Sequence, residues 1–257
     1  MMREVYSTLF LVLCIYHVEG ESAVLGQHFL HIIKRQEFFS QGNTAAIEFQ
    51  AKSKSYPDLP SWLTLKQRTE LQDAYLFGTP RAGAVSTDIQ IIALNKGTYQ
   101  TEQDAFSITV DTTKDLPKNI VELRVKNYNI EEFLAGQALS NLTRIMAKLW
   151  PEAGTLQVVK VSSLVDELGR VPVPDGPMQP LPKEGVLVQI GGAGDFSALL
   201  ASVSQQVNNT NCMNQEQFIG IREDFEPEFN LDWCAFKMFP LVSYSCLKLY
   251  NICFKKN

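Results

Sequence analysis

The sequence predicts a mainly β protein of two domains, an antiparallel β-sandwich followed by an α+β domain. Between residues 27 and 112, short runs alternate apolar and polar residues, which is typical of half-buried strands. Beyond residue 119, strand-like runs alternate with two helical patterns. The chain has 257 residues, of which 45% are hydrophobic and 20% charged, so it can bury a substantial core and is not disordered throughout.

The first 20 residues have the pattern of a secretory signal peptide. Arg3 gives a weakly positive start, residues 9–16 form an apolar run, and Val18 and Gly20 are small enough to precede a cleavage site. The run is shorter than the roughly 20 apolar residues of a membrane span. A first strand or buried helix of a cytosolic protein is the alternative, but position, length and flanking residues favour a signal peptide and therefore the secretory pathway.

Six short strands are expected in the first domain, residues 27–112. In the clearest of them, Ala45, Ile47, Phe49 and Ala51 fall on one face. Turn residues separate the runs and no convincing helix interrupts them, which favours an antiparallel sandwich. The polar segment 111–119 contains a proline and is expected to link the domains. The expected strands are residues 29–33, 45–51, 63–67, 74–77, 87–94 and 106–110.

The second domain, residues 119–237, is expected to follow the order β-α-β-β-α-β. That order is the split-βαβ arrangement of ferredoxin-like folds. Asn129 is a suitable cap for the first helix and Pro151 ends it. Residues 171–182 contain five prolines and are expected to form an extended loop, and residues 238–257 a divergent tail. The expected elements are strands 121–125, 155–164, 185–190 and 229–235 and helices 130–149 and 196–207.

Few residues are suited to catalysis. Only His28 and His31 remain after removal of the signal peptide, and three apart on a strand they point to opposite faces. The glycine-rich turn at residues 191–194 lies between a strand and a helix, where phosphate could bind, but it lacks a following Lys-Ser/Thr pair and the third fingerprint glycine. A tight connection is therefore favoured over a nucleotide-hydrolysing enzyme, and no catalytic or cofactor-binding residue is assigned.

The charged residues give little indication of a nucleic-acid-binding surface or a metal site. The net charge is −5 with scattered Lys and Arg, whereas a nucleic-acid surface needs a concentrated basic face. Calcium stays possible at the carboxylates of Asp224, Glu226 and Glu228, or near Asp111 and the following linker. A solvated acidic loop is favoured because the converging oxygens of a calcium site are not evident in the pattern. No metal ligand is assigned.

Cysteines and glycosylation triplets fit an extracellular chain. Without the signal peptide the cysteines are Cys212, Cys234, Cys246 and Cys253, all in the last quarter, so any disulfide would constrain only that region. No Cys-x-x-Cys pair is present to indicate a zinc ribbon or a thioredoxin-like site. The triplets at Asn141 and Asn208 match the N-glycosylation pattern.

One segment of the first domain resembles the dystroglycan-type cadherin-like domain. Residues 56–63 read Tyr-Pro-Asp-Leu-Pro-Ser-Trp-Leu and residues 76–80 read Leu-Phe-Gly-Thr-Pro. In that family the first motif opens a strand and the second closes the next hairpin. The physical roles expected here are an extended backbone at Pro60, a core position for Trp62 before Leu63, and a turn at Gly78 and Pro80.

Three motifs of the second domain resemble alpha- and epsilon-sarcoglycan. They are Gly169-Arg170-Val-Pro172-Val-Pro174, the Lys-Glu-Gly-Val stretch at 183–186, and Asp232-Trp233-Cys234, with Trp233 expected in the core. The resemblance implies a non-enzymatic single-pass glycoprotein of the plasma membrane, notably the sarcolemma of muscle. It also implies assembly with beta-, gamma- and delta-sarcoglycan to stabilise the dystrophin–dystroglycan link. The alternative is a soluble, secreted ligand- or glycan-binding module.

The chain departs from the sarcoglycan pattern in two places. The family has four clustered cysteines, of which only the second and fourth are matched, so the resemblance implies a Cys212–Cys234 disulfide worth about 3 kcal/mol. The match also ends near residue 237, whereas relatives continue through a stalk, a membrane span and a cytoplasmic tail. Residues 238–254 are apolar but short and include Lys248, so a span there is not expected.

Overall fold

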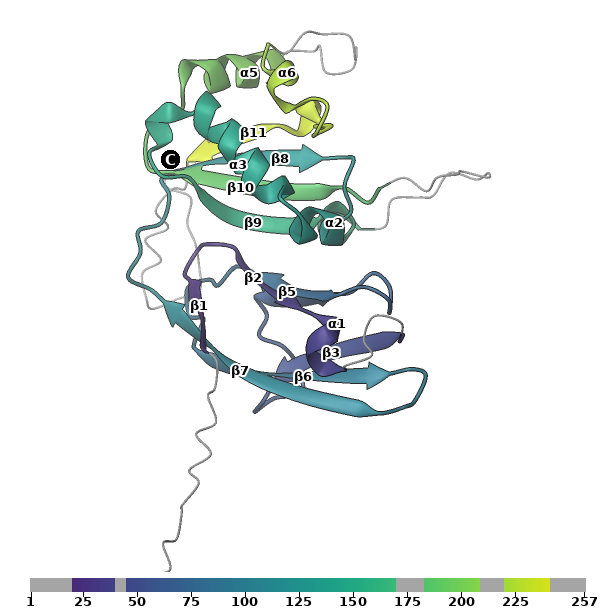
Figure 1. Ribbon diagram of the computed structural model, residues 1–257. Helices are drawn as coiled ribbons and strands as arrows, with labels where there is room; N and C mark the ends of the chain where they lie inside the picture. Colours follow the sequence, from purple (N-terminus) through teal and green to yellow (C-terminus); the bar gives the residue numbers. More distant parts are fainter. Residues whose placement is uncertain (1–19, 40–44, 170–182, 209–219, 241–257) are drawn as a thin grey trace, which may run out of the picture.

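The computed structural model describes residues 20–39, 45–169, 183–208 and 220–240, and these form two units stacked on one another (Figure 1). The first unit is built from strands β1 to β7 and the second from strands β8 to β11 with the larger helices. Strands and helices together make the protein a β-rich α+β structure, as the sequence predicts. Within the described residues, no helix is long and apolar enough to cross a bilayer.

The first unit is a sandwich of two sheets. One sheet has the order β1-β7-β6-β3, with β1 Gly20–Val24, β3 Ile47–Ser53, β6 Thr87–Asn95 and β7 Thr101–Asp111. The other has the order β2-β5-β4, with β2 Phe29–Ile33, β4 Leu63–Lys66 and β5 Ala74–Gly78. All six predicted strands are present. Two elements were not predicted: β1, which pairs in parallel with β7, and the short helix α1 Arg35–Phe38.

The sandwich core follows the predicted alternation. Ile47 and Phe49 are buried, Ala51 is half-buried on the same face, and the register places Phe49 opposite Ala93 of β6. One apolar cluster fills the space between the two sheets. Because β1 runs parallel to β7, the sandwich is mixed rather than purely antiparallel.

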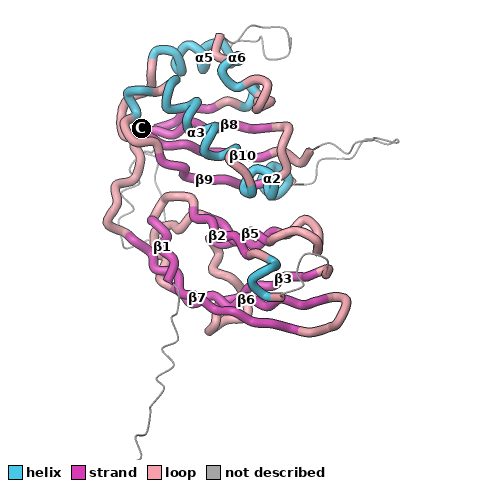
Figure 2. Tube along the Cα trace, in the orientation of Figure 1, coloured by secondary structure: helices cyan, strands magenta, loops and turns pink. Residues whose placement is uncertain are grey.

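The second unit is a four-stranded sheet in the order β11-β8-β10-β9, with every neighbouring pair antiparallel. Its strands are β8 Asn119–Val125, β9 Gln157–Ser163, β10 Val186–Gly192 and β11 Lys237–Pro240. Its helices are α2 Ile130–Ala135, α3 Ala138–Leu149, α4 Leu164–Leu168, α5 Ala198–Asn208 and α6 Arg222–Phe225 (Figure 2). The predicted order β-α-β-β-α-β is therefore present with additional short helices. The specific cadherin-like and ferredoxin-like assignments stay predictions.

Two predicted elements of the second unit are wrong in detail. The helix expected over residues 130–149 is two helices, because α2 ends at Ala135, with Gly136 as its C-cap, and α3 begins at Ala138. The alternation over residues 229–235 does not form a strand: Trp233–Ala235 is a 3-10 helix, and the last strand is β11. The amide of Asp232 donates to the carbonyl of Arg124 at 2.8 Å, which ties the chain to β8 before it turns. Strands β1 and β11 extend the folded units beyond the predicted bounds of 27 and 237.

The tryptophans pack differently from the expectation. Trp150, for which no role was predicted, is fully buried and donates from Nε1 to the carbonyl of Asp195 at 2.7 Å. Trp62 and Trp233 pack against the two cores but stay partly exposed. Trp233 contacts Phe225 edge-to-face, with ring centroids 5.5 Å apart. Trp62 is therefore at the margin of the sandwich core, where it can also face solvent.

Candidate functional site

The two domains share part of one apolar core. Tyr75 and Phe77 of β5 belong to the cluster that fills the second domain, and Leu30 and Ile32 of β2 pack against it. Figure 1 shows the three-stranded sheet of the sandwich facing β9 and α2. Because apolar side chains of both domains leave water together, the hydrophobic effect favours one fixed arrangement of the two domains.

The outer edge of β9 is closed by the first domain. The amide of His28 donates to the carbonyl of Val158 at 2.8 Å, and the hydroxyl of Thr79 donates to the carbonyl of Val159 at 2.6 Å. Edge strands otherwise present unpaired backbone groups. These two bonds therefore fix the first domain against a defined register of the second.

The imidazole of His28 is held neutral at this contact. Both ring nitrogens are buried without a hydrogen-bond partner among the described residues, although the residue as a whole keeps some exposure. Its ring lies against Phe77, with centroids 6.0 Å apart. Burial disfavours the charged form and lowers the pKa of His28 to about 4. The sequence places His28 on a strand, but it lies just before β2, at the domain contact.

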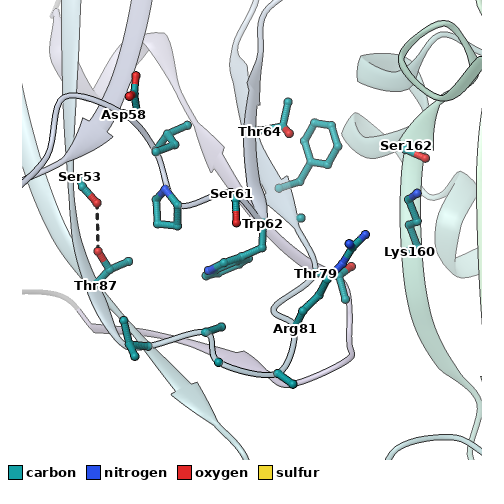
Figure 3. Close-up of a pocket in the computed structure, with 18 of the residues that line it drawn as sticks. Ser53, Asp58, Ser61, Trp62, Thr64, Thr79, Arg81, Thr87, Lys160 and Ser162 are labelled. Carbon is teal, nitrogen blue, oxygen red and sulfur yellow. Dashed lines mark hydrogen bonds between the residues drawn. The ribbon is translucent and has the colours of Figure 1, made fainter. Parts of the chain in front are cut away.

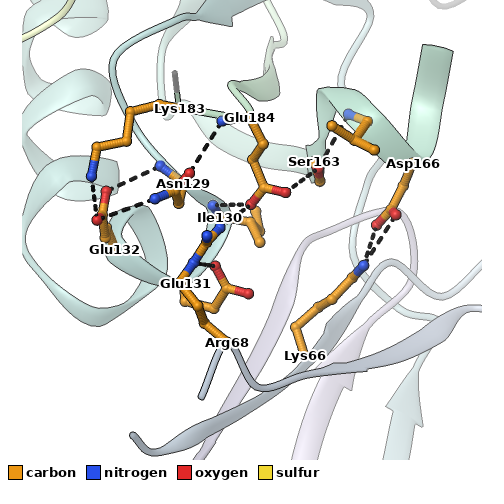
Figure 4. Close-up of polar contacts among 11 residues, drawn as sticks. Lys66, Arg68, Asn129, Ile130, Glu131, Glu132, Ser163, Asp166, Lys183 and Glu184 are labelled. Atoms are coloured by element: carbon orange, nitrogen blue, oxygen red, sulfur yellow. Dashed lines mark hydrogen bonds and ion pairs between the residues drawn. The ribbon is translucent and has the colours of Figure 1, made fainter. Parts of the chain in front are cut away.

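The contact between the two domains is called the joint, and Glu184 is the centre of a polar network across it (Figure 4). Its Oε1 accepts the amide of Ile130 at 2.8 Å, and its Oε2 accepts the hydroxyl of Ser163 at 3.0 Å. Arg68 of the first domain reaches the same carboxylate, with Nη2 3.2 Å from Oε1. The carboxylate of Glu184 therefore accepts hydrogen bonds from the first residue of α2 and the last residue of β9, and it also pairs with Arg68 of the first domain.

Further ion pairs flank Glu184. The Nε of Arg68 lies 3.1 Å from Oε2 of Glu131, a residue only 9% exposed, so one guanidinium contacts two carboxylates. Lys66 of the first domain lies 2.8 Å from Asp166 of α4. Exposed pairs are weak alone, but a shared Arg with a mostly buried Glu resists solvent screening better.

The helix that faces the joint begins with the predicted cap. The side chain of Asn129 accepts a bond from the N3 amide, while Glu132 accepts from the amide of Asn129 at 3.1 Å, which completes a capping box. Lys183 lies 2.5 Å from Glu132, and the amide of Glu184 donates to Oδ1 of Asn129 at 3.1 Å. Hydrogen bonding and the nearby Lys183 lower the pKa of Glu132 despite an opposing desolvation effect. The cap therefore also positions Glu184.

A groove of about 890 Å³ opens beside the joint (Figure 3). Its first wall consists of residues 53–62 and the segment 77–87 of the sandwich, and its second wall consists of β9 and α4. Trp62 lies within it, packed edge-to-face against Phe29 at 6.0 Å on its core side. The exposed side chains of Tyr56 and Val85 border it, each 73% exposed.

Many polar groups of the groove already have partners. Lys160 lies 2.6 Å from Glu167, and the hydroxyls of Ser53 and Thr87 are 3.2 Å apart. Desolvation opposes, and the bond and charge of Lys160 bring about, a lowering of the pKa of Glu167. The hydroxyl of Ser162 is buried and has no hydrogen-bond partner among the described residues.

The first-domain motif residues meet around this groove. Pro60 accepts the amide of Leu63 at 2.9 Å, and Leu63 is buried opposite Gly78 in the β4–β5 pair. A methyl group on Gly78 would lie 1.7 Å from the carbonyl oxygen of Trp62, so only glycine allows the strands to approach there. Gly78 serves close packing within β5 rather than the predicted turn, while Pro80 follows it and is buried.

The second-domain motif residues are more dispersed. Gly169 ends α4 with a φ of 80°, a conformation that favours glycine. Cys234 is disulfide-bonded and Trp233 lies beside it, but Cys212, Arg170, Pro172 and Pro174 are outside the described residues, so the Cys212–Cys234 pairing stays a prediction. Of the glycosylation candidates, Asn208 ends α5, and its side chain is not described.

Asn141, the other glycosylation candidate, is in α3. Its Nδ2 donates to Glu228 at 2.7 Å, and its Oδ1 accepts from Arg144 at 3.0 Å. Glu226 pairs with Arg222 at 2.5 Å, so two of the predicted acidic loop carboxylates have protein partners. Within the described residues, no group of three or more His, Cys, Asp or Glu is arranged to hold a metal ion.

The glycine-rich turn is a packing contact. A methyl group on Gly194 would lie 1.7 Å from the carbonyl oxygen of Glu152, and one on Gly192 would lie 2.6 Å from Cβ of Ala153. The amide of Ala193 donates to the carbonyl of Ala153 at 2.9 Å. The glycines therefore allow the end of β10 to approach the segment after α3, in agreement with the tight connection expected from the sequence.

The ion pairs between the domains were not predicted from the sequence: Arg68 with Glu131, and Lys66 with Asp166. Arg68 and Glu184 are 116 positions apart, and neither belongs to a local pattern that reports a contact between domains. The one sequence feature that marked this region was the Lys-Glu-Gly-Val motif at residues 183–186. It contains Glu184 and begins with Lys183, which pairs with Glu132.

Two family models match the chain one after the other. The sarcoglycan alpha/epsilon N-terminal domain matches residues 20–110, and the sarcoglycan alpha/epsilon second domain matches residues 116–240. Epsilon-sarcoglycan from Bos taurus is 32% identical over 83% of this chain and 51% of its own length. Alpha-sarcoglycan from Homo sapiens is 29% identical over 82% of this chain and 56% of its own length. The chain thus spans about half the length of the curated relatives it matches.

Proposed function

Because the chain belongs to the alpha/epsilon sarcoglycan family, we propose that it is a non-enzymatic, extracellular subunit of a sarcoglycan complex. Its partners are beta-, gamma- and delta-type sarcoglycans, and the assembly stabilises the link between dystrophin and dystroglycan. The single observation that carries this proposal is the consecutive match of both family models to two domains joined through Glu184.

The joint supports a structural role. The shared core and the Arg68–Glu184 contact hold two domains at a fixed angle, so their combined surface is preorganised. Preorganisation lowers the entropy that a partner must lose on binding. The proposal also includes a signal peptide at residues 1–20, N-glycans at Asn141 and Asn208, a Cys212–Cys234 disulfide, and a place on the outer side of the plasma membrane, at the sarcolemma in muscle.

Co-expression tests the proposal. The tagged full chain is produced in cultured cells with beta-, gamma- and delta-sarcoglycan and recovered from the cell surface. We expect all three partners in constant ratio, and lower recovery for Glu184→Ala than for the control Glu102→Ala, because only the former loosens the joint. Glu102 is an exposed carboxylate without a hydrogen bond or ion pair to any described residue. A chain secreted as a monomer, with none of the three partners, would contradict the proposal.

The second candidate function is a soluble, secreted ligand- or glycan-binding module. The observation that favours it is the groove between the domains, which contains an accessible tryptophan. The same co-expression separates the two candidates, because a secreted module is recovered from the medium without sarcoglycan partners.

A further inference from the structure

The groove beside the joint has polar groups with no partner among the described residues. The exposed guanidinium of Arg81 makes no hydrogen bond or ion pair there, although its charge contributes to lowering the pKa of Glu167. The indole Nε1 of Trp62 and the hydroxyls of Ser61 and Thr64 likewise have no hydrogen-bond partner within the described ranges. Figure 3 shows Trp62 and Arg81 on the sandwich side, with the side chain of Arg81 extending toward Lys160.

These uncommitted groups are mainly hydrogen-bond donors. Arg81 and the indole of Trp62 can only donate, and hydroxyl groups can do either. The carboxylates of Asp166 and Glu167 are paired with Lys66 and Lys160, at 2.8 and 2.6 Å. The remaining lining carboxylate, Asp58, lies apart from Arg81 in Figure 3. The end of the groove near Arg81 therefore matches a ligand rich in acceptors, with a negative charge.

The shape of the groove favours a small ligand over an added peptide strand. Its volume of about 890 Å³ falls within the roughly 300–1,000 Å³ of small-molecule sites. Extended peptides bind by pairing with a free strand edge. Here the edge strand β9 has the carbonyls of Val158 and Val159 occupied, and the amide of Leu63 at the start of β4 is bonded to Pro60. Both edges that border the groove are thus partly closed to pairing.

We propose that this groove binds an acidic saccharide, in which the ring of Trp62 contacts the apolar face of one sugar and Arg81 pairs with the carboxylate of a uronic acid. Trp offers a flat, apolar surface with one polar donor, which suits a ring that has both apolar faces and hydroxyl groups. Arg presents a planar fork of donors that matches a carboxylate in two-point geometry. The site does not depend on the proposed sarcoglycan assembly.

Titration with a hyaluronan tetrasaccharide, which carries uronates, tests the site on the full chain. The three indole N–H signals are followed by ¹H–¹⁵N NMR, and Trp62→Phe assigns the signal of Trp62. We expect this signal to shift selectively, because Trp150 is buried and Trp233 is outside the groove. The neutral chitotetraose is expected to bind at least about tenfold more weakly, since a hydrogen bond to a charged group is lost.

Matched variants identify the determinant. Arg81→Gln should weaken tetrasaccharide binding at least about tenfold, while Lys126→Gln, which removes an equal charge on an exposed residue outside the groove, should leave it unchanged. Both positions are exposed, so the thermal transition should not move. An unmoved Trp62 signal at millimolar tetrasaccharide, equal binding of chitotetraose, or equal binding of a hexaglutamate peptide would each overturn the proposal, the last by assigning the groove to acidic peptides.

Discussion

Glu184→Ala is expected to destabilise the chain more than any exposed carboxylate change. The substitution removes the acceptor of the Ile130 amide and of the Ser163 hydroxyl, which is attached to a residue only 1% exposed. A hydrogen bond to a charged group contributes about 1.5–3 kcal/mol. The Arg68 contact adds only about 0.5 kcal/mol because that side chain is partly exposed. With water replacing part of the loss, we expect about 3 kcal/mol, or a fall of about 6–12 °C in Tm for a chain of this size.

Thermal unfolding followed by circular dichroism measures this effect, with Glu102→Ala as the control. Arg68→Ala should cost about 1 kcal/mol, because it leaves Glu131 without its ion pair. The double variant then gives the coupling between Arg68 and Glu184, expected at about 0.5 kcal/mol across the domains. The reasoning is refuted if Glu184→Ala shifts Tm no more than Glu102→Ala does.

Three further predictions concern His28, Gly78 and the Cys212–Cys234 disulfide. His28→Leu should remove a pH dependence of the free energy of unfolding. Because the folded-state pKa of His28 is about 4, its contribution is complete above about pH 6.5 and falls by about 3 kcal/mol as the pH drops towards 4. Urea titrations of wild type and variant should therefore diverge below about pH 6.5. Gly78→Ala should cost about 3 kcal/mol or more by forcing β4 and β5 apart, whereas Gly97→Ala, with its nearest contact at 3.4 Å, should cost under about 1 kcal/mol in the same assay. Unreduced peptide mapping should recover Cys212 linked to Cys234, and separate peptides would exclude that disulfide.

Local patterns predicted most of the strands, because a half-buried strand leaves its alternation in the sequence. Ile47 and Phe49 are an example: both were expected on one face and both are buried. The Asn129 cap was also predictable, since a cap depends on residues three positions apart. The strand predicted over Phe229–Ala235 was wrong because so short an alternating run is compatible with several conformations. The hydrogen bond from Asp232 to Arg124 favours the turn that is observed.

The joint and the groove could not be predicted in the same way. They depend on pairs such as Lys66 with Asp166, 100 positions apart, and no local period reports such a contact. Trp62 was predicted to lie in the core, whereas it packs at the margin of the sandwich core and stays partly exposed. The motif at residues 183–186 pointed to Glu184 only through family resemblance, and its role in the joint required the structure.

The capped edge of β9 has a consequence for biosynthesis. The amide of His28 and the hydroxyl of Thr79 cover carbonyls that an isolated second domain would leave bare. Uncovered strand edges recruit other chains and lead to aggregation. Because the N-terminal domain is synthesised first, we expect it to cover these carbonyls as β9 forms. Variants that loosen the joint should therefore reduce yield through retention and degradation before they alter any property of the mature protein.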